Sequence, residues 1–231
     1  MSVVITPPAQ TVVPVAEGRS FPVHRIYCVG RNYAAHAREM GFDPDREPPF
    51  FFLKPADAAL PVAEGRTGTM TYPSLTTSLH HEVELVVAIG RGGRDIAVAD
   101  AAQHVWGYAI GLDMTRRDLQ SDLKKQGRPW CIAKAFEQSA PIGPIHPLAR
   151  TGRLTKGAIT LHVNGQPRQQ GDLSQLIWSV EEIIAQLSTA WLLQPGDLIY
   201  TGTPAGVGAV NRGDLMEARI DGLGLLRVAV A

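Results

Sequence analysis

Three carboxylates lie in segments of the chain that are otherwise apolar. Glu82 and Glu84 belong to LHHEVELVVAIG (residues 79–90), and Asp113 ends the apolar run in WGYAIGLDM (residues 106–114). Side chains alternate along a strand, so Glu82 and Glu84 would share one face with His80. A buried carboxylate is unfavourable unless it is paired, hydrogen-bonded or bound to a cation. Three oxygen ligands suit Mg²⁺, Mn²⁺ or Ca²⁺ better than zinc, and a Mg²⁺-like ion keeps positions open for catalysis.

Structural alternatives remain open for these residues. The face with Glu82 and Glu84 could meet water, although it continues with the apolar Val86 and Ala88. Asp113 could cap a helix that begins in TRRDLQ. His80 has no assigned role, and orienting one of the glutamates is a candidate for it.

His36 and Glu39 form a second candidate pair. If NYAAHAREMG (residues 32–41) is a helix, their i, i+3 spacing places both on one face. A carboxylate beside an imidazole can fix its tautomer and raise its basicity, as a general base for water requires. The alternative is a solvated surface pair without a catalytic role.

Lys134 and Thr203 offer groups that could bind an anionic substrate. In WCIAKAF (residues 130–136), an extended backbone would place Lys134 on an apolar face, where it must reach water or meet an anion. In YTGTPAGVG (residues 200–208), small residues let backbone N–H groups approach a carboxylate, and the Thr203 hydroxyl adds a donor. This turn lacks the lysine and the spacing of a phosphate-binding P-loop.

The elements that must position these groups are mostly short strands. We expect an α+β fold dominated by a mixed sheet, since no regular βαβ alternation is visible. Asn164-Gly165 predicts a type I′ hairpin turn. Helical periodicity is strongest in residues 173–193, through an apolar stripe of Leu176, Ile177, Val180, Ile183, Ile184 and Leu187.

Terminal signals set the boundaries of the other expected elements. Asn32 and Gly41 are the candidate N-cap and C-terminal stop of the helix that carries His36. Thr115 and Gly127 have the same roles in the helix of TRRDLQSDLKKQG. Another short helix is expected near residues 98–104. Residues 1–24, rich in proline and valine, are predicted to be an irregular lead-in to a single domain over residues 25–231.

Composition narrows the class of partner. The chain has 231 residues, 45% of them hydrophobic, and its 22 basic and 22 acidic residues cancel. No net field favours nucleic acid, and no apolar run reaches the length of a membrane span, so a small-molecule partner is expected. Cys28 and Cys131 form no CxxC pair and are predicted to be buried and reduced. We therefore expect a cytoplasmic protein.

Six motifs in order together resemble one known family. They are YCVGRNYAAHAREMG, FFLKP, HHEVELVVAIG, GYAIGLDMTRRDLQ, GRPWCIAKAFEQSAPIGP and GDLIYTGTPAGVG. This order resembles the fumarylacetoacetate hydrolase family from about residue 25 to the C-terminus. The resemblance implies a mixed β-sheet roll with a few short peripheral helices, a homodimer, and Mg²⁺ or Mn²⁺ in the active site.

The resemblance also implies roles for individual residues. Glu82, Glu84 and Asp113 match the family's metal ligands. His36 and Glu39 match its water-activating pair, on a segment that acts as a mobile lid in relatives. Residues that match contacts to the substrate are Lys134 and Thr203, with Gln120 and Arg31 as weaker candidates.

Within the family, VGRNYAAHAREMG and DREPPFFFLKPADA look most like fumarylpyruvate hydrolases of the gentisate pathway. The expected substrate is a 2,4-dioxo acid whose carbon–carbon bond is cleaved by water, giving fumarate and pyruvate. His36 would take the proton from water, and the metal with the Lys134 ammonium would stabilise the pyruvate enolate. Three alternatives stay open: an acylpyruvate hydrolase, an oxaloacetate decarboxylase or tautomerase, and an inert member that binds metal and ligand.

Overall fold

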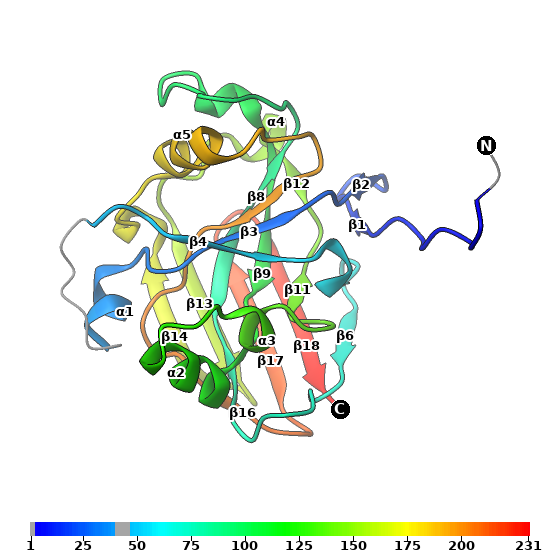
Figure 1. The fold of residues 1–231 in the computed structure, drawn as a ribbon, viewed down its shortest axis with the longest axis vertical. Helices are drawn as coiled ribbons and strands as arrows, with labels where there is room; N and C mark the ends of the chain where they lie inside the picture. The colour runs from blue at the N-terminus through cyan, green and yellow to red at the C-terminus, as the bar shows by residue number, and fades with distance from the viewer. Residues whose placement is uncertain (1–2, 40–46) are drawn as a thin grey trace.

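The computed structural model of the chain describes residues 3–39 and 47–231, and Figure 1 shows that these residues form layered β-sheets with helices at the periphery. The largest sheet has the strand order β4-β3-β15-β8-β9-β11-β5, with β12 added beside β9. Its strands are β3 (Ile26–Val29), β4 (Phe51–Lys54), β5 (Ala59–Pro61), β8 (Val83–Ile89), β9 (Val105–Leu112), β11 (Ala140–Ile142), β12 (His146–Pro147) and β15 (Leu198–Tyr200). The β15–β3 and β11–β5 pairs are parallel and the other pairs are antiparallel, so the predicted mixed sheet is confirmed.

Three smaller sheets complete the β-structure. A five-stranded sheet has the order β14-β13-β17-β18-β6, a three-stranded sheet has the order β10-β7-β16, and β1 pairs with β2. Their strands are β1 (Val12–Pro14), β2 (Ser20–Pro22), β6 (Thr67–Met70), β7 (Leu79–His81), β10 (Thr115–Arg116), β13 (Ala158–Val163), β14 (Gln166–Asp172), β16 (Gly208–Val210), β17 (Leu215–Ile220) and β18 (Gly224–Val230). The β13–β14 turn has positive φ at both Asn164 (52°) and Gly165 (75°), which confirms the type I′ hairpin.

The helices are short. They are α1 (Ala34–Glu39), α2 (Arg117–Lys125), α3 (Cys131–Lys134), α4 (Leu148–Thr151) and α5 (Val180–Ala190), with 3₁₀ turns η1 (Ala56–Ala58), η2 (Ala101–His104) and η3 (Leu173–Gln175). The segment that contains Lys134 is therefore helical, so the extended backbone considered for it in the sequence analysis does not occur. No helix within the described ranges combines the length and hydropathy that a membrane span needs.

Strand β8 is buried along its whole length because both of its faces meet a core. Leu85, Val87 and Ile89 pack into the larger hydrophobic cluster, which also draws on the five-stranded sheet, while Val86 and Ala88 pack into a second cluster. Burying each such side chain contributes about 1.5–3 kcal/mol. Glu82 and Glu84 point to the opposite side from Leu85, Val87 and Ile89. They therefore share a face with Val86 and Ala88, and the second cluster covers that face. The interpretation of that face as water-exposed is excluded.

The N-terminal segment is more regular than its prolines suggest. Residues 12–22 form the β1–β2 ribbon, and Val13 and Phe21 are buried in the second hydrophobic cluster. The prediction of an irregular segment is wrong for these residues, because the prolines stand at strand ends where no ladder hydrogen bond is lost. The assignment of residues 25–231 to one domain stays a prediction.

Helix boundaries follow local signals in one case and tertiary contacts in others. Helix α5 begins after Ser179, whose side chain forms a capping box with Glu182. The predicted apolar stripe holds from Val180 onward, but Leu176 and Ile177 precede the helix.

The predicted caps of the other two helices are wrong. The Asn32 side chain accepts from Trp178 N and donates to the carbonyls of Trp178 and Thr201, so it joins two segments instead of capping α1. Thr115 lies in β10 and donates to the carbonyl of Asp113, while α2 starts two residues later. Gly127, with φ of +62°, follows the end of α2 as predicted. Gly41, the expected stop of the first helix, lies outside the described residues.

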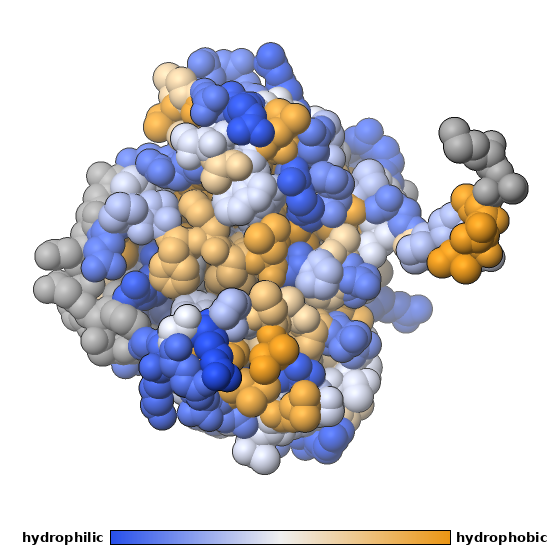
Figure 2. Space-filling view, viewed as in Figure 1, coloured by the Kyte–Doolittle hydropathy of each residue, from blue (hydrophilic) through white to orange (hydrophobic). Residues whose placement is uncertain are grey.

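The surface in Figure 2 includes an apolar area over β4 and α3. Leu53 and Ile132, one from each element, expose 41% and 54% of their surface. The two cysteines are free, Cys28 is buried and Cys131 is exposed, so the prediction of burial is wrong for Cys131.

Candidate active site

The antiparallel pairing of β8 with β9 brings three carboxylates together. Val83 pairs with Leu112, so the same register places Glu82 opposite Asp113, and Asp113 N donates to the Glu82 carbonyl at 2.9 Å. Opposite residues of an antiparallel pair project to the same side, and Glu84 joins them by the two-residue period. One carboxylate oxygen from each of the three lies within 4.8 Å of the others, and all three residues are at least 95% buried.

Three cationic side chains surround the carboxylates. Lys134 Nζ lies 2.8 Å from Glu82 Oε2 and 2.7 Å from Asp113 Oδ2, and Lys54 Nζ lies 2.8 Å from Asp113 Oδ1. Arg117 donates to Glu82 Oε1. Asp113 is therefore occupied by two lysines, and its alternative role as a helix cap is excluded. The Lys134 ammonium meets anions instead of reaching water.

The charges divide the carboxylates into two kinds. Burial alone would raise the pKa of Glu82, but the charges of Lys134 and Arg117 lower it well below its usual range. Burial raises the pKa of Glu84 well above its ordinary value, and the Asp113 and Glu82 charges raise it further. For Lys134, burial disfavours the ammonium, yet Asp113 and Glu82 raise its pKa above the usual value. Glu84 is thus the carboxylate whose ionised form most lacks a compensating charge.

The donor set fits a hard divalent cation. Asp113 Oδ1 has no hydrogen bond despite its proximity to Lys54, which approaches it as a point charge outside hydrogen-bond geometry. Glu84 Oε2 accepts from Gly202 N at 2.8 Å, which orients its carboxylate. Like charges this close in a buried site are stabilised when a cation joins them. The three carboxylates therefore have the chemistry of a Mg²⁺ or Mn²⁺ site.

Helix α1 supplies a histidine–carboxylate pair at the same site. His36 Nδ1 and Glu39 Oε2 are 3.2 Å apart, and His36 is 95% buried. Gly206 N lies 3.1 Å from both oxygens of Glu39, so the loop after β15 holds the carboxylate in place. The solvated surface alternative is thereby excluded for His36.

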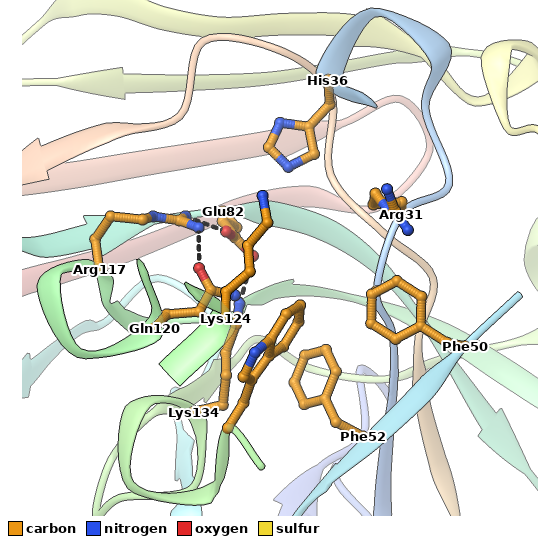
Figure 3. Close-up of a pocket in the computed structure, with 11 residues that line it drawn as sticks. Arg31, His36, Phe50, Phe52, Glu82, Arg117, Gln120, Lys124 and Lys134 are labelled. Atoms are coloured by element: carbon orange, nitrogen blue, oxygen red, sulfur yellow. Dashed lines mark hydrogen bonds and ion pairs between the residues drawn. The ribbon is translucent and has the colours of Figure 1, made fainter. Parts of the chain in front are cut away.

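A cavity of about 220 Å³ is lined by His36 of the pair and by Glu82 of the three carboxylates. Figure 3 shows His36, Arg31, Phe50 and Phe52 along one side, with Arg117 and Gln120 on the other. The lining residues are Gly30, Arg31, His36, Phe50, Phe52, Glu82, Arg117, Gln120, Lys124, Trp130 and Lys134. The cavity thus has an acidic base, a general-base candidate above it, and a wall that combines aromatic and cationic side chains.

Comparison with known proteins places the chain in a family. The family model described as Fumarylacetoacetate (FAA) hydrolase C-terminal matches residues 25–231. The chain belongs to the fumarylacetoacetate hydrolase family. The resemblance of the six sequence motifs, and the mixed-sheet fold that it implied, are confirmed.

Three activities are named among the similar members of the family. The crystal structure of a fumarylpyruvate hydrolase from Pseudomonas aeruginosa, in complex with Mn²⁺ and pyruvate, is 57% identical, with a TM-score of 0.98 over 100% of this chain and 99% of that one. The mitochondrial oxaloacetate tautomerase of Rattus norvegicus is 45% identical over 89% of this chain and 90% of that protein. The mitochondrial oxaloacetate decarboxylase of Dictyostelium discoideum is 42% identical over 86% and 89%.

The candidates for substrate contacts divide between the cavity and the protein interior. Gln120 and Arg31 line the cavity, as does Lys134. Thr203 does not: its hydroxyl donates to the Val83 carbonyl at 2.8 Å and accepts from Gln169 Nε2 at 2.7 Å. Its predicted contact with the substrate would have to replace the bond to Val83.

The sequence interpretation missed several residues that support the site. Lys54 was detectable, because a lone lysine in the apolar strand FFLK poses the same problem as Lys134. Gln169 was not detectable: from β14, its side chain accepts from His81 Nδ1 and Val83 N and donates to Thr203, which ties three segments together. His80 contacts Ser78 Oγ at 3.1 Å, and burial lowers its pKa to about 4. That contact gives no support to a role in orienting a glutamate.

Proposed function

We propose that the protein is a metal-dependent hydrolase that cleaves the C3–C4 bond of a 2,4-dioxo acid, with fumarylpyruvate as its substrate. The observation that carries the proposal is a cavity lined by His36, which is paired with Glu39, and by Glu82, which belongs to the buried cluster with Glu84 and Asp113. The similarity to a fumarylpyruvate hydrolase with bound Mn²⁺ and pyruvate supports it. A place in gentisate catabolism follows from the same resemblance and is part of the proposal.

In this mechanism Glu82, Glu84 and Asp113 would hold Mg²⁺ or Mn²⁺. When bound, the cation would supply a Lewis acid that polarises the 2-oxo group of the substrate. Glu39 accepts a hydrogen bond from His36 Nδ1, which leaves Nε2 unprotonated and able to take a proton from water.

The resulting hydroxide adds to C4, and the C3–C4 bond breaks. Its electron pair becomes the enolate of pyruvate, and C4 becomes a carboxylate of fumarate. A proton then adds to C3 to complete pyruvate. Lys134, held between Glu82 and Asp113, places an ammonium beside the developing negative charge, where fixed charges contribute most to catalysis.

Charge balance at the site favours an anionic substrate. The three carboxylates, when ionised, are balanced by Lys54, Lys134 and Arg117. A divalent cation therefore leaves the base of the cavity with net positive charge. A substrate that carries a carboxylate and develops an enolate complements that charge.

The second candidate is oxaloacetate tautomerisation or decarboxylation, which two of the relatives favour. Decarboxylation uses the same enolate stabilisation but needs no attacking water. The buried His36, paired with Glu39, favours hydrolysis. Replacing His36 with alanine should abolish hydrolysis and leave decarboxylation largely intact, which separates the two reactions in one variant.

The deciding experiment is a substrate panel of fumarylpyruvate, acetylpyruvate and oxaloacetate. Each is incubated with protein stripped of metal and then supplied with Mg²⁺ or Mn²⁺, and loss of enol absorbance and release of pyruvate are followed. We expect metal-dependent turnover with the highest kcat/KM for fumarylpyruvate. No turnover of any substrate with metal present would refute the proposed enzymatic activity. The alternative of an inert family member that binds metal and ligand would then stand.

The family expectation of a homodimer is also part of the proposal. The apolar area around Leu53 and Ile132 is a candidate contact between two copies, since exposed apolar patches commonly mark interfaces. Light scattering coupled to size exclusion should give about twice the 24.9 kDa of the chain. A monomer at micromolar concentration would refute this expectation without affecting the proposed chemistry.

A further inference from the structure

One face of α2 turns three long side chains toward the cavity. Arg117, Gln120 and Lys124 are spaced i, i+3 and i+7, a period that places them along one side of the helix, and all three line the cavity. Arg117 pairs with Glu82 at the acidic base of the cavity and also donates to Gln120 Oε1 at 2.5 Å. Lys124 lies two turns further along the helix and is exposed. The cavity lining therefore includes a cationic side chain in addition to Arg117 and Lys134, which pair with the carboxylate cluster.

Arg31 adds to the positive charge at that position. Figure 3 shows Arg31 beside Phe50, and its guanidinium carbon lies 5.3 Å from the centre of the Phe50 ring. Partial burial lowers the pKa of Lys124, and the like charges of Arg31 and Arg117 lower it further. Arg31 also lies 3.5 Å from Glu47, whose side chain is 70% exposed, and such a surface pair is weak. A substrate carboxylate in this part of the cavity would meet two cationic side chains.

The positions of the carboxylates separate the candidate substrates. An extended seven-carbon dioxo diacid separates its terminal carboxyl carbons by about 7.5 Å, so its distal carboxylate lies well beyond a pyruvyl half bound at the carboxylate cluster. Oxaloacetate spans only about 4 Å, so its second carboxylate stays closer to that cluster.

The wall between the two ends suits a flat, unsaturated chain. Phe50, Phe52 and Trp130 line it, and the Trp130 ring lies 5.4 Å from that of Phe50 and 5.9 Å from that of Phe52, both edge to face. Aromatic faces pack well against planar conjugated groups. An acyl group with a carbon–carbon double bond conjugated to its carboxylate has this shape.

We propose that Arg31 and Lys124 bind the distal carboxylate of the substrate, which makes the enzyme selective for dioxo diacids over acylpyruvates with an uncharged acyl group. This inference rests on the proposed hydrolase function and specifies its substrate class. The two residues act in specificity, and the chemistry at the carboxylate cluster does not involve them.

The test compares fumarylpyruvate with acetylpyruvate, which lacks the distal carboxylate. Lys124→Gln and Arg31→Gln should each lower kcat/KM for fumarylpyruvate roughly 10- to 30-fold, the effect of losing one charged hydrogen bond, mainly through a higher KM. For acetylpyruvate, kcat/KM should change less than about twofold. Lys124→Arg, which keeps the charge, should restore most of the selectivity. Lys125→Gln is the matched control, because Lys125 is exposed, pairs with Asp122 at 3.5 Å and lies outside the cavity lining.

Equal losses on the two substrates, or unchanged kcat/KM for fumarylpyruvate, would overturn the inference and leave the hydrolase function in place. No turnover of either substrate by the metal-loaded wild-type enzyme would overturn the proposed function and the inference with it.

Discussion

Replacing Lys54 with methionine tests the charge balance of the site without touching the cavity lining. Lys54 Nζ lies 2.8 Å from Asp113 Oδ1 and donates to the carbonyls of Met114, at 3.3 Å, and Lys134. The side chain is fully buried, and methionine has nearly the same volume. The substitution therefore removes the ammonium, and the protein keeps its packing.

The expected loss of stability is large. Removing one partner of a buried ion pair costs about 3–5 kcal/mol, because the other charge is left uncompensated. For a chain of this size, each kcal/mol lowers Tm by about 2–4 °C, so the metal-free variant should melt about 6–20 °C below the wild type. Mn²⁺ should raise Tm more in the variant than in the wild type, since a bound cation replaces part of the lost charge.

Thermal unfolding in EDTA and in Mn²⁺, followed by calorimetry or circular dichroism, measures both effects. Lys125→Met is the control, because replacing this exposed lysine should change the free energy of unfolding by less than about 0.5 kcal/mol. A metal-free Tm for Lys54→Met within about 2 °C of the wild type would show that the lysine is not needed to balance Asp113. An equal Mn²⁺ shift in both proteins would show that Lys54 and the cation do not share these carboxylates.

Three further predictions concern the other parts of the site and the scaffold. The folded protein raises the pKa of Glu84 above its ordinary 4.5, so the metal-free protein should lose stability as pH rises above that value. Urea unfolding in EDTA should show this loss in the wild type and not in Glu84→Gln. Identical slopes of stability against pH in the two proteins would contradict the prediction. His36→Ala should lower kcat for fumarylpyruvate by about 10²–10⁴-fold with unchanged Mn²⁺ affinity by calorimetric titration, and a parallel loss of affinity would assign His36 to the metal site. Ser179→Ala should remove the capping box of α5 and cost about 1 kcal/mol, seen as a Tm about 2–4 °C lower; an unchanged Tm would mean that the cap does not stabilise the helix.

Much of the site was predictable because its signals are local. Alternation along residues 79–90 placed Glu82 and Glu84 on one face, and Asn164-Gly165 determined a hairpin turn by its own backbone preference. Ser179 and Glu182 carried a capping box that the periodicity of the long apolar segment obscured. In each case the residues that decide the structure are within a few positions of one another.

The errors arise where distant segments decide. Asn32 and Thr115 have the residue types of caps, but the Asn32 side chain bonds to two distant segments, and Thr115 belongs to β10, which pairs with β7. Lys134 belongs to the helical turn α3, and its ammonium contacts Glu82 and Asp113 at once. WCIAKAF alone does not contain these two distant partners, so it does not predict the contacts. The opposition of Glu82 and Asp113 depends on the register of β8 with β9, which a single sequence does not specify.

The most direct test of the central claim is hydrolysis of fumarylpyruvate in water enriched in ¹⁸O. The mechanism adds the water oxygen to C4, so each fumarate should carry one ¹⁸O atom in a carboxylate, with one pyruvate formed per fumarate. Mass spectrometry of the Mn²⁺-loaded enzyme's products, with the EDTA-treated protein as control, measures both. Release of CO₂ or isomerisation of the substrate without labelled fumarate would contradict the assignment of this protein as a carbon–carbon hydrolase.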